Sequence, residues 1–157
     1  MTVHLAQFNV ARLTAAQNDP RVADFMNTLD AINALGEAHP GFVWRYQDDS
    51  GSAVDTDVFD DLRVILNYTI WKSVEALRSY VYSGGHLEYF QRRREWFETS
   101  SEPSLVMWWV PEGTIPDLDE SQGRLAHLRA NGLNAVAFGF AQAIGMEPTW
   151  VPLPAMS

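Results

Sequence analysis

The chain of 157 residues is 46% hydrophobic and 12% aromatic, which is enough apolar material to bury the core of one compact domain. Its formal charge is −9, with 20 acidic and 11 basic residues, so phosphate backbones and anionic lipid headgroups are repelled. We therefore expect a small-molecule ligand or a protein partner, with no nucleic acid and no membrane. The sequence contains no cysteine, which excludes disulfides and zinc–thiolate sites and favours a cytoplasmic setting.

The first half of the chain predicts three strands and one helix. Residues 4–13 are apolar with little charge, which is typical of a central strand covered on both faces. A start signal at Asp19 precedes apolar residues at helical spacing as far as residue 38. Residues 42–46 and 63–71 are rich in β-branched and aromatic residues and predict two more strands. Six aspartates between positions 48 and 61 lack the spacing of a calcium loop, so we expect a solvated loop there.

Residues 73–97 predict a helix that is divided in two. Ser73 is placed to cap the first part, whose apolar residues continue at helical spacing as far as Gly84 and Gly85. Because two adjacent glycines weaken a helix, we expect it to bend or stop there. The second part is expected to start near His86.

The last third of the chain predicts a strand, a helix and a strand. Residues 105–110 form an apolar β-rich run, and a capping box begins a helix over residues 117–132. The apolar run of residues 135–141 predicts a fifth strand. Residues 144–157 contain three prolines and predict an extended tail held by the ring of Trp150.

This order of elements predicts one domain over residues 1–143, with the tail of residues 144–157 outside it. It contains a split βαββαβ unit, so we expect an α+β fold with a ferredoxin-like antiparallel sheet and helices on one face. Such a sheet normally leaves its other face in water, yet three of the strands are apolar on both faces. We therefore expect a second copy to cover that face, giving a homodimer.

The second part of the divided helix carries the strongest functional pattern. At 100° per residue, one side of this helix collects aromatic residues, with His86 and Arg93 near the centre of the same side. The functional hypothesis is that both side chains reach into an apolar cavity, where they bind an oxygen of the ligand and His86 moves a proton. The structural alternative is that Arg93 ties the helix to the sheet and His86 is a satisfied core histidine.

Polar residues within predicted strands supply the rest of the candidate site, since a mid-strand Asn is disfavoured unless it has a hydrogen-bonding role. Asn9, Arg12, Arg45 and Asn67 are expected to point inward, either to line the cavity or to bridge strands or subunits. We predict His86 and Arg93 as catalytic residues. The predicted substrate-binding residues are Asn9, Arg12, Trp44, Asn67, Tyr89 and Trp96.

Several chemistries lack their motifs. The sequence has no HExxH, no glycine-rich phosphate loop and no GxSxG, and its four histidines show no paired ligand spacing, so no metal site is expected. No tightly bound cofactor is expected either. Haem with His86 as its proximal ligand stays open, because haem needs one protein ligand and an apolar cavity.

Long ordered blocks of the sequence resemble one bacterial family. The blocks are LAQFNVARL, PGFVWRYQ, NYTIWKSVEALRSYVY, HLEYFQRRREWF, LVMWWVPEG and RLAHLRANGLNAVAFGF, which together span roughly residues 4–140. They resemble the domain-of-unknown-function family 3291. That family is similar to the dimeric α/β-barrel superfamily, which includes antibiotic biosynthesis monooxygenases. The resemblance implies that fold and agrees with a dimer, but it implies no single reaction.

Three functional hypotheses follow. The first is a small-molecule enzyme of monooxygenase-like or lyase/isomerase type, acting on an aromatic or polyketide-like metabolite between helices and sheet. A cofactor-free oxygenase needs a base, a group that stabilises charge and a dry cavity, and this chain has residues for all three. The second is a non-catalytic dimer that binds an aromatic metabolite. The third is a haem-binding protein.

Overall fold

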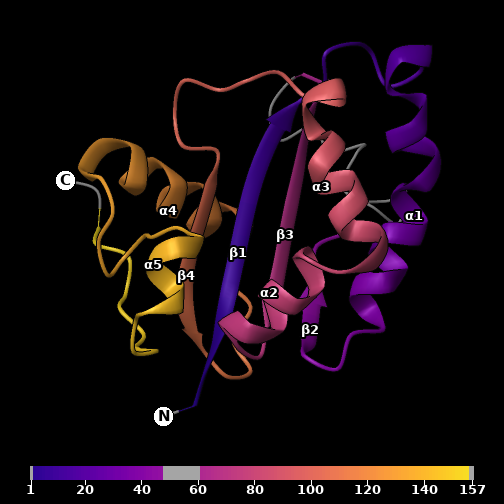
Figure 1. The fold of residues 1–157 in the computed structure, drawn as a ribbon. Helices are drawn as coiled ribbons and strands as arrows, with labels where there is room; N and C mark the ends of the chain where they lie inside the picture. Colours follow the sequence, from indigo (N-terminus) through magenta and orange to yellow (C-terminus); the bar gives the residue numbers. More distant parts are fainter. Residues whose placement is uncertain (1, 48–60, 156–157) are drawn as a thin grey trace.

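The computed structural model describes residues 2–47 and 61–155, and it begins with a long strand, a helix and a short strand (Figure 1). Strand β1 covers Val3–Arg12, helix α1 covers Ala23–Glu37 and strand β2 covers Phe42–Arg45. A 3-10 turn over Pro20–Val22 leads into α1, and the Asp19 side chain caps that turn. The aspartate-rich loop predicted between positions 48 and 61 lies almost entirely outside the described residues.

The second part of the described chain contains two strands and four helices. They are, in order, β3 (Val64–Trp71), α2 (Val74–Val81), α3 (Gly84–Trp96), β4 (Leu105–Pro111), α4 (Leu118–Asn131) and α5 (Phe140–Ile144). Ser73 caps α2 by accepting a hydrogen bond from Ala76 N, and Gly84 has a φ of 54°, which favours glycine where the chain turns into α3. The predicted division of the helix is therefore confirmed. No helix in residues 2–47 and 61–155 is long and apolar enough to cross a membrane.

The four strands form one antiparallel sheet in the order β2-β3-β1-β4. The long strands β1 and β3 occupy its centre, and their register places Asn9 directly opposite Asn67. Helices α2 and α3 lie in front of the sheet in Figure 1, and α1 packs beside α3. The predicted α+β class and ferredoxin-like antiparallel sheet are confirmed.

The other face of the sheet is buried within one chain. Strand alternation turns Phe8, Tyr68 and Trp108 to that face, where they are at most 1% exposed. Helix α4 packs there, behind β4 in Figure 1, with the Arg124 guanidinium 5.6 Å from the centre of the Trp108 ring. The expectation that only a second copy would cover this face is therefore wrong, because α4 of the same chain packs on it. The homodimer itself stays a prediction.

The predicted fifth strand over residues 135–141 is wrong. Only Phe138 pairs with β4, exchanging two backbone hydrogen bonds with Met107, and α5 then begins at Phe140. Gly139 stops the pairing, since its N–H donates to the side chain of Gln142 and caps α5. The apolar alternation that predicts a strand here also fits a single bridge followed by a short helix.

Residues 145–155 form no helix or strand, and they are held in a different way from the one expected. Trp150 is 41% exposed, so its ring does not hold them. The buried Arg124 side chain instead donates to the carbonyl of Val151 at 2.8 Å. Leu153 packs so closely on Gly123 that a Cβ there would lie 2.7 Å from Leu153 Cδ2. These contacts join the segment to α4.

Candidate functional site

A cavity of about 540 Å³ lies between the sheet and helices α1 and α3. A smaller space of about 230 Å³ adjoins it toward α2. Both are lined by Asn9 and Asn67 from the sheet and by Tyr80 and Phe90 from the helices, so they form one continuous cavity with a larger and a smaller lobe. The larger lobe alone has the size of pockets that hold drug-sized molecules.

The sheet lines this cavity with amide groups. Gln7 donates from Nε2 to Asn67 Oδ1 at 2.8 Å and to Thr69 Oγ1 at 3.0 Å. Trp71 Nε1 also donates to Thr69 Oγ1, at 2.9 Å. These bonds leave the Asn67 Nδ2 group and the Asn9 side chain with no hydrogen bond to any described residue. Two neighbouring amides are therefore free to meet a polar ligand atom.

The helices line the larger lobe with aromatic rings. Phe25 of α1 contacts Phe97 edge-on, with ring centroids 4.9 Å apart. Tyr89 of α3 lines the lobe and is stacked on Trp96 behind it, at 5.2 Å. Tyr80 donates its hydroxyl to Ile32 O at 2.9 Å, and burial raises the pKa of Tyr80 to about 12, so its phenol stays neutral. The lobe therefore suits a flat apolar ligand.

His86 lines the smaller lobe near the start of α3. Its Nδ1 lies 3.2 Å from Val81 O, and its ring lies 4.6 Å from that of Tyr80. A carbonyl only accepts hydrogen bonds, so Nδ1 carries the proton and Nε2 keeps its lone pair. Burial lowers the pKa of His86, and the hydrogen bond to Val81 only partly opposes this. The imidazole is therefore a neutral potential base at neutral pH.

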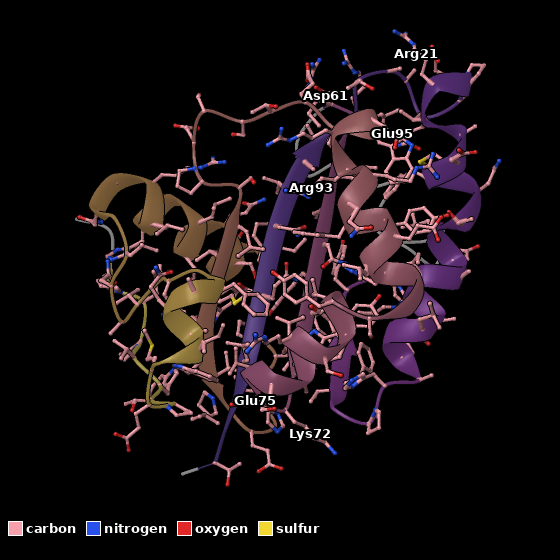
Figure 2. All side chains as sticks on the ribbon, viewed as in Figure 1. Arg21, Asp61, Lys72, Glu75, Arg93 and Glu95 are labelled. Carbon is pink, nitrogen blue, oxygen red and sulfur yellow. The ribbon has the colours of Figure 1, made fainter. Side chains whose placement is uncertain are left out.

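Arg93 lines the larger lobe, two helical turns away from His86. Its guanidinium lies 4.2 Å from the centre of the Phe90 ring and donates to Phe90 O at 2.7 Å. Figure 2 shows Arg93 on the side of α3 that faces β1. The structure thus brings His86 and Arg93 to one cavity but places them in different lobes.

Arg12 does not line the cavity. Strand alternation gives it the opposite direction from Asn9, and its side chain pairs with Asp61 at 3.0 Å and with Glu98 at 2.7 Å. Hydrogen bonds to these two carboxylates raise the pKa of Arg12, so its charge is fully engaged. Arg12, which is predicted to bind substrate, therefore lies outside the cavity lining and forms an ion-pair cluster at the end of the sheet.

Trp44 and Trp96 also lie outside the cavity lining. A bulge at Val43 adds one residue to β2, which turns Trp44 to the far face of the sheet, where its ring packs 4.9 Å from that of Tyr68. Trp96 is 2% exposed and belongs to a small core behind Tyr89. Both are predicted to bind substrate, but Trp44 is partly buried against the core and Trp96 is a buried core residue.

Several lining residues were missed from the sequence, among them Gln7, Thr69 and Tyr80. Period-two alternation contains the signal for the first two, since they lie two positions from Asn9 and Asn67 on the same faces. The inward direction predicted for Arg45 is confirmed, and its side chain pairs with Glu37. The described residues contain no group of three or more potential ligands for a metal ion.

The lowered pKa of His86 predicts a pH-dependent stability. The unfolded chain binds the proton more readily than the folded chain, so the free energy of unfolding falls as the pH drops below about 6.5, the ordinary value for histidine. We expect urea unfolding at pH 8 and pH 5.5 to show a larger loss for the wild type than for His86→Gln. Equal losses in the two proteins would contradict a buried neutral imidazole.

The sheet, its helical cover and the cavity define a ferredoxin-like α+β protein with an internal space of ligand size. The chain belongs to the family described as Domain of unknown function (DUF3291), whose model matches residues 4–150. The family resemblance predicted from the sequence is thereby confirmed. No functionally curated protein matches the chain.

Several solved structures are similar to this chain at low sequence identity. A Nitrosomonas europaea protein, provisionally assigned as an antibiotic biosynthesis monooxygenase, is 13% identical, with a TM-score of 0.50 over 73% of this chain and 95% of that one. SnoaB, a cofactor-independent oxygenase from Streptomyces nogalater, is 16% identical, with a TM-score of 0.47 over 73% and 98%. A Chloroflexus aurantiacus protein with the same provisional assignment as the first is 19% identical, with a TM-score of 0.42 over 72% and 97%. The likeness to the Nitrosomonas europaea protein shows the fold alone.

Proposed function

We propose that this protein binds a small aromatic or polyketide-like metabolite in the cavity and acts on it as a monooxygenase-like or lyase/isomerase enzyme without a tightly bound cofactor. One observation carries the proposal. The Asn9 side chain and the Nδ2 group of Asn67, which have no hydrogen bond to a described residue, lie side by side in a cavity with several aromatic rings, next to a lobe that holds the neutral imidazole of His86. A ligand with a ring and a carbonyl oxygen matches this arrangement.

The chemistry that fits these groups is proton abstraction next to a carbonyl. His86 Nε2 takes the proton, and the carbonyl oxygen gains negative charge as the carbanion forms. The amide N–H groups of Asn9 and Asn67 donate to that oxygen and stabilise the charge that develops on it. The carbanion then reacts with dioxygen, or it is protonated at another carbon. The first outcome is oxygenation, and the second is isomerisation.

Anthrone is a suitable test substrate, because it is a flat aromatic ketone with an acidic C–H. We expect protein-dependent oxygen uptake or loss of the anthrone absorbance, and we expect His86→Ala to lower the rate by about 10²-fold or more, as for the loss of a general base. Asn67→Leu is expected to lower the rate by about 10² because it removes a donor to the developing oxyanion. His127→Ala changes a histidine of α4, away from the cavity, and serves as the matched control.

The separation of His86 from Arg93 favours a second candidate, a binding protein without turnover. In that case the His86→Ala variant binds the ligand with nearly unchanged affinity. The wild type converts none of the aromatic ketones in a test panel. Turnover that is equal in the wild type and in His86→Ala would contradict the proposed role of the imidazole.

A further inference from the structure

The charges around the larger lobe are unevenly paired. Arg93 and Arg94 both line the lobe, and neither forms an ion pair with a residue in the described parts of the chain. The other charged lining residues are already paired, Arg45 with Glu37 and Glu98 with Arg12 at 2.7 Å. The lobe therefore carries excess positive charge in a protein whose net charge is −9.

The helix dipole explains why two arginines lie at the end of α3, but it does not explain why neither of them has an ion-pair partner. Basic residues in the last turn of a helix are favoured by the helix dipole, and Arg93 and Arg94 both lie in that turn of α3. Arg92 precedes them but turns away from the cavity, and it meets Asp24 at 2.8 Å and Glu95 at 2.9 Å. Figure 2 places Arg93 and Glu95 on different sides of α3. Within Gly84–Trp96, the side of α3 that faces solvent and α1 has carboxylates and the cavity side has none, and Glu98, which follows the helix and lines the lobe, is paired with Arg12.

We propose that the ligand is an anion. Resting on the proposed function, this inference narrows the substrate class to an aromatic molecule that carries a carboxylate or another anionic group. The ring lies against the aromatic residues of the larger lobe, and the anionic group lies between Arg93 and Arg94 at its edge. Unpaired guanidinium groups in a partly enclosed site attract such a group and raise its local concentration.

A pair of fluorescent probes tests the charge preference directly. 8-Anilino-1-naphthalenesulfonate is an anion, and N-phenyl-1-naphthylamine has the same rings without the sulfonate. In low salt we expect the wild type to bind the anion at least about tenfold more tightly, equivalent to about 1.4 kcal/mol. We expect this preference to shrink in 0.5 M NaCl, because salt screens partly exposed charges.

Variants that remove arginines from different sides of α3 locate the effect. The double variant Arg93→Gln/Arg94→Gln is expected to lose about tenfold in affinity for the anionic probe and to keep its affinity for the neutral one. Arg92→Gln removes a charge from the same helix on the opposite side and is expected to leave the affinity for both probes unchanged. Asn67→Trp fills the cavity and is expected to weaken the binding of both, with circular dichroism confirming that the variant is folded.

The outcomes separate the two proposals. Equal binding of both probes, or an equal loss of anion binding in Arg92→Gln and in the double variant, overturns the anionic ligand and leaves the proposed function standing. Anion binding that survives in folded Asn67→Trp shows that the probe binds elsewhere and also overturns the inference. If neither probe binds the wild type, the cavity does not take aromatic ligands, and both proposals fail.

Discussion

Replacing Arg124 by Met is expected to lower the free energy of unfolding by about 3 kcal/mol, although the two side chains are similar in length. Arg124 is 1% exposed, and its Nη1 donates to Val136 O at 3.0 Å and to Val151 O at 2.8 Å. Methionine fills the space over Trp108 but donates nothing, so both carbonyls lose their bonds from Arg124. Each lost bond to a charged group costs about 1.5–3 kcal/mol.

Two features moderate this loss. Burial lowers the pKa of Arg124, and its Nε lies buried without a hydrogen-bond partner in residues 2–47 and 61–155, so the arginine already bears a desolvation penalty. Its partner Glu120 is partly exposed and is not left as a buried charge. Urea unfolding measures the effect, with Arg129→Met, an exposed change on the same helix, as the control. A difference below about 1 kcal/mol between the two variants would contradict the structural role.

Gly41→Ala is expected to destabilise the fold by about 2–3 kcal/mol through overpacking. A Cβ at Gly41 would lie 2.2 Å from Ala76 Cβ in α2, closer than real contacts allow. The backbone has little freedom to retreat, because Gly41 N donates to His39 Nδ1 at 3.0 Å and Lys72 N donates to Gly41 O at 2.8 Å. The turn before β2 and the start of α2 are therefore in direct contact.

A second substitution separates this steric effect from other causes. In Gly41→Ala/Ala76→Gly the methyl group moves from one side of the contact to the other, so the clash is removed. We expect the double variant to recover most of the stability, apart from about 1 kcal/mol for a glycine within α2. Thermal or urea unfolding of both single variants and the double variant completes the cycle. If the double variant loses as much stability as the two single variants together, the contact between residues 41 and 76 is not the cause of the destabilisation. Gly145→Ala, with no atom within 4 Å of the added methyl, is the neutral control.

The sequence predicts most of the sheet correctly, because its strongest signals are local. The β-branched run of β3, the Ser73 cap and the glycines before α3 each determine backbone conformation by themselves. The placement of α4 was not predictable in the same way. The apolar stripe of α4 predicts that the helix packs on an apolar surface. It does not indicate which face of the sheet provides that surface. A sheet face that lacks an assigned helix then predicts a second copy as its cover.

Strand alternation accounts for two of the site residues predicted from the sequence, and a bulge accounts for one of the errors. Asn9 and Asn67 lie on the cavity side, as expected for inward polar residues of β1 and β3. Trp44 was misplaced because the bulge at Val43 reverses the faces of the residues that follow it, and a single sequence gives no sign of a bulge there. Arg93 follows the predicted helical phase, and its separation from His86 along α3 is readable from the sequence. Their placement in different lobes depends on how the surrounding side chains pack, which the helical pattern does not contain.

The two faces of β1 differ in how tightly their side chains are packed. On one side Phe8 is completely inaccessible among other core rings, and on the other Asn9 faces a space that no side chain fills. A residue in a tightly packed core constrains its neighbours, whereas one that borders an empty volume tolerates replacement. Changes at position 9, whose side chain has no hydrogen bond to a described residue, therefore alter what the cavity accepts with little loss of stability. A cavity-lining position of this kind allows ligand preference to change among family members while the sheet keeps its structure.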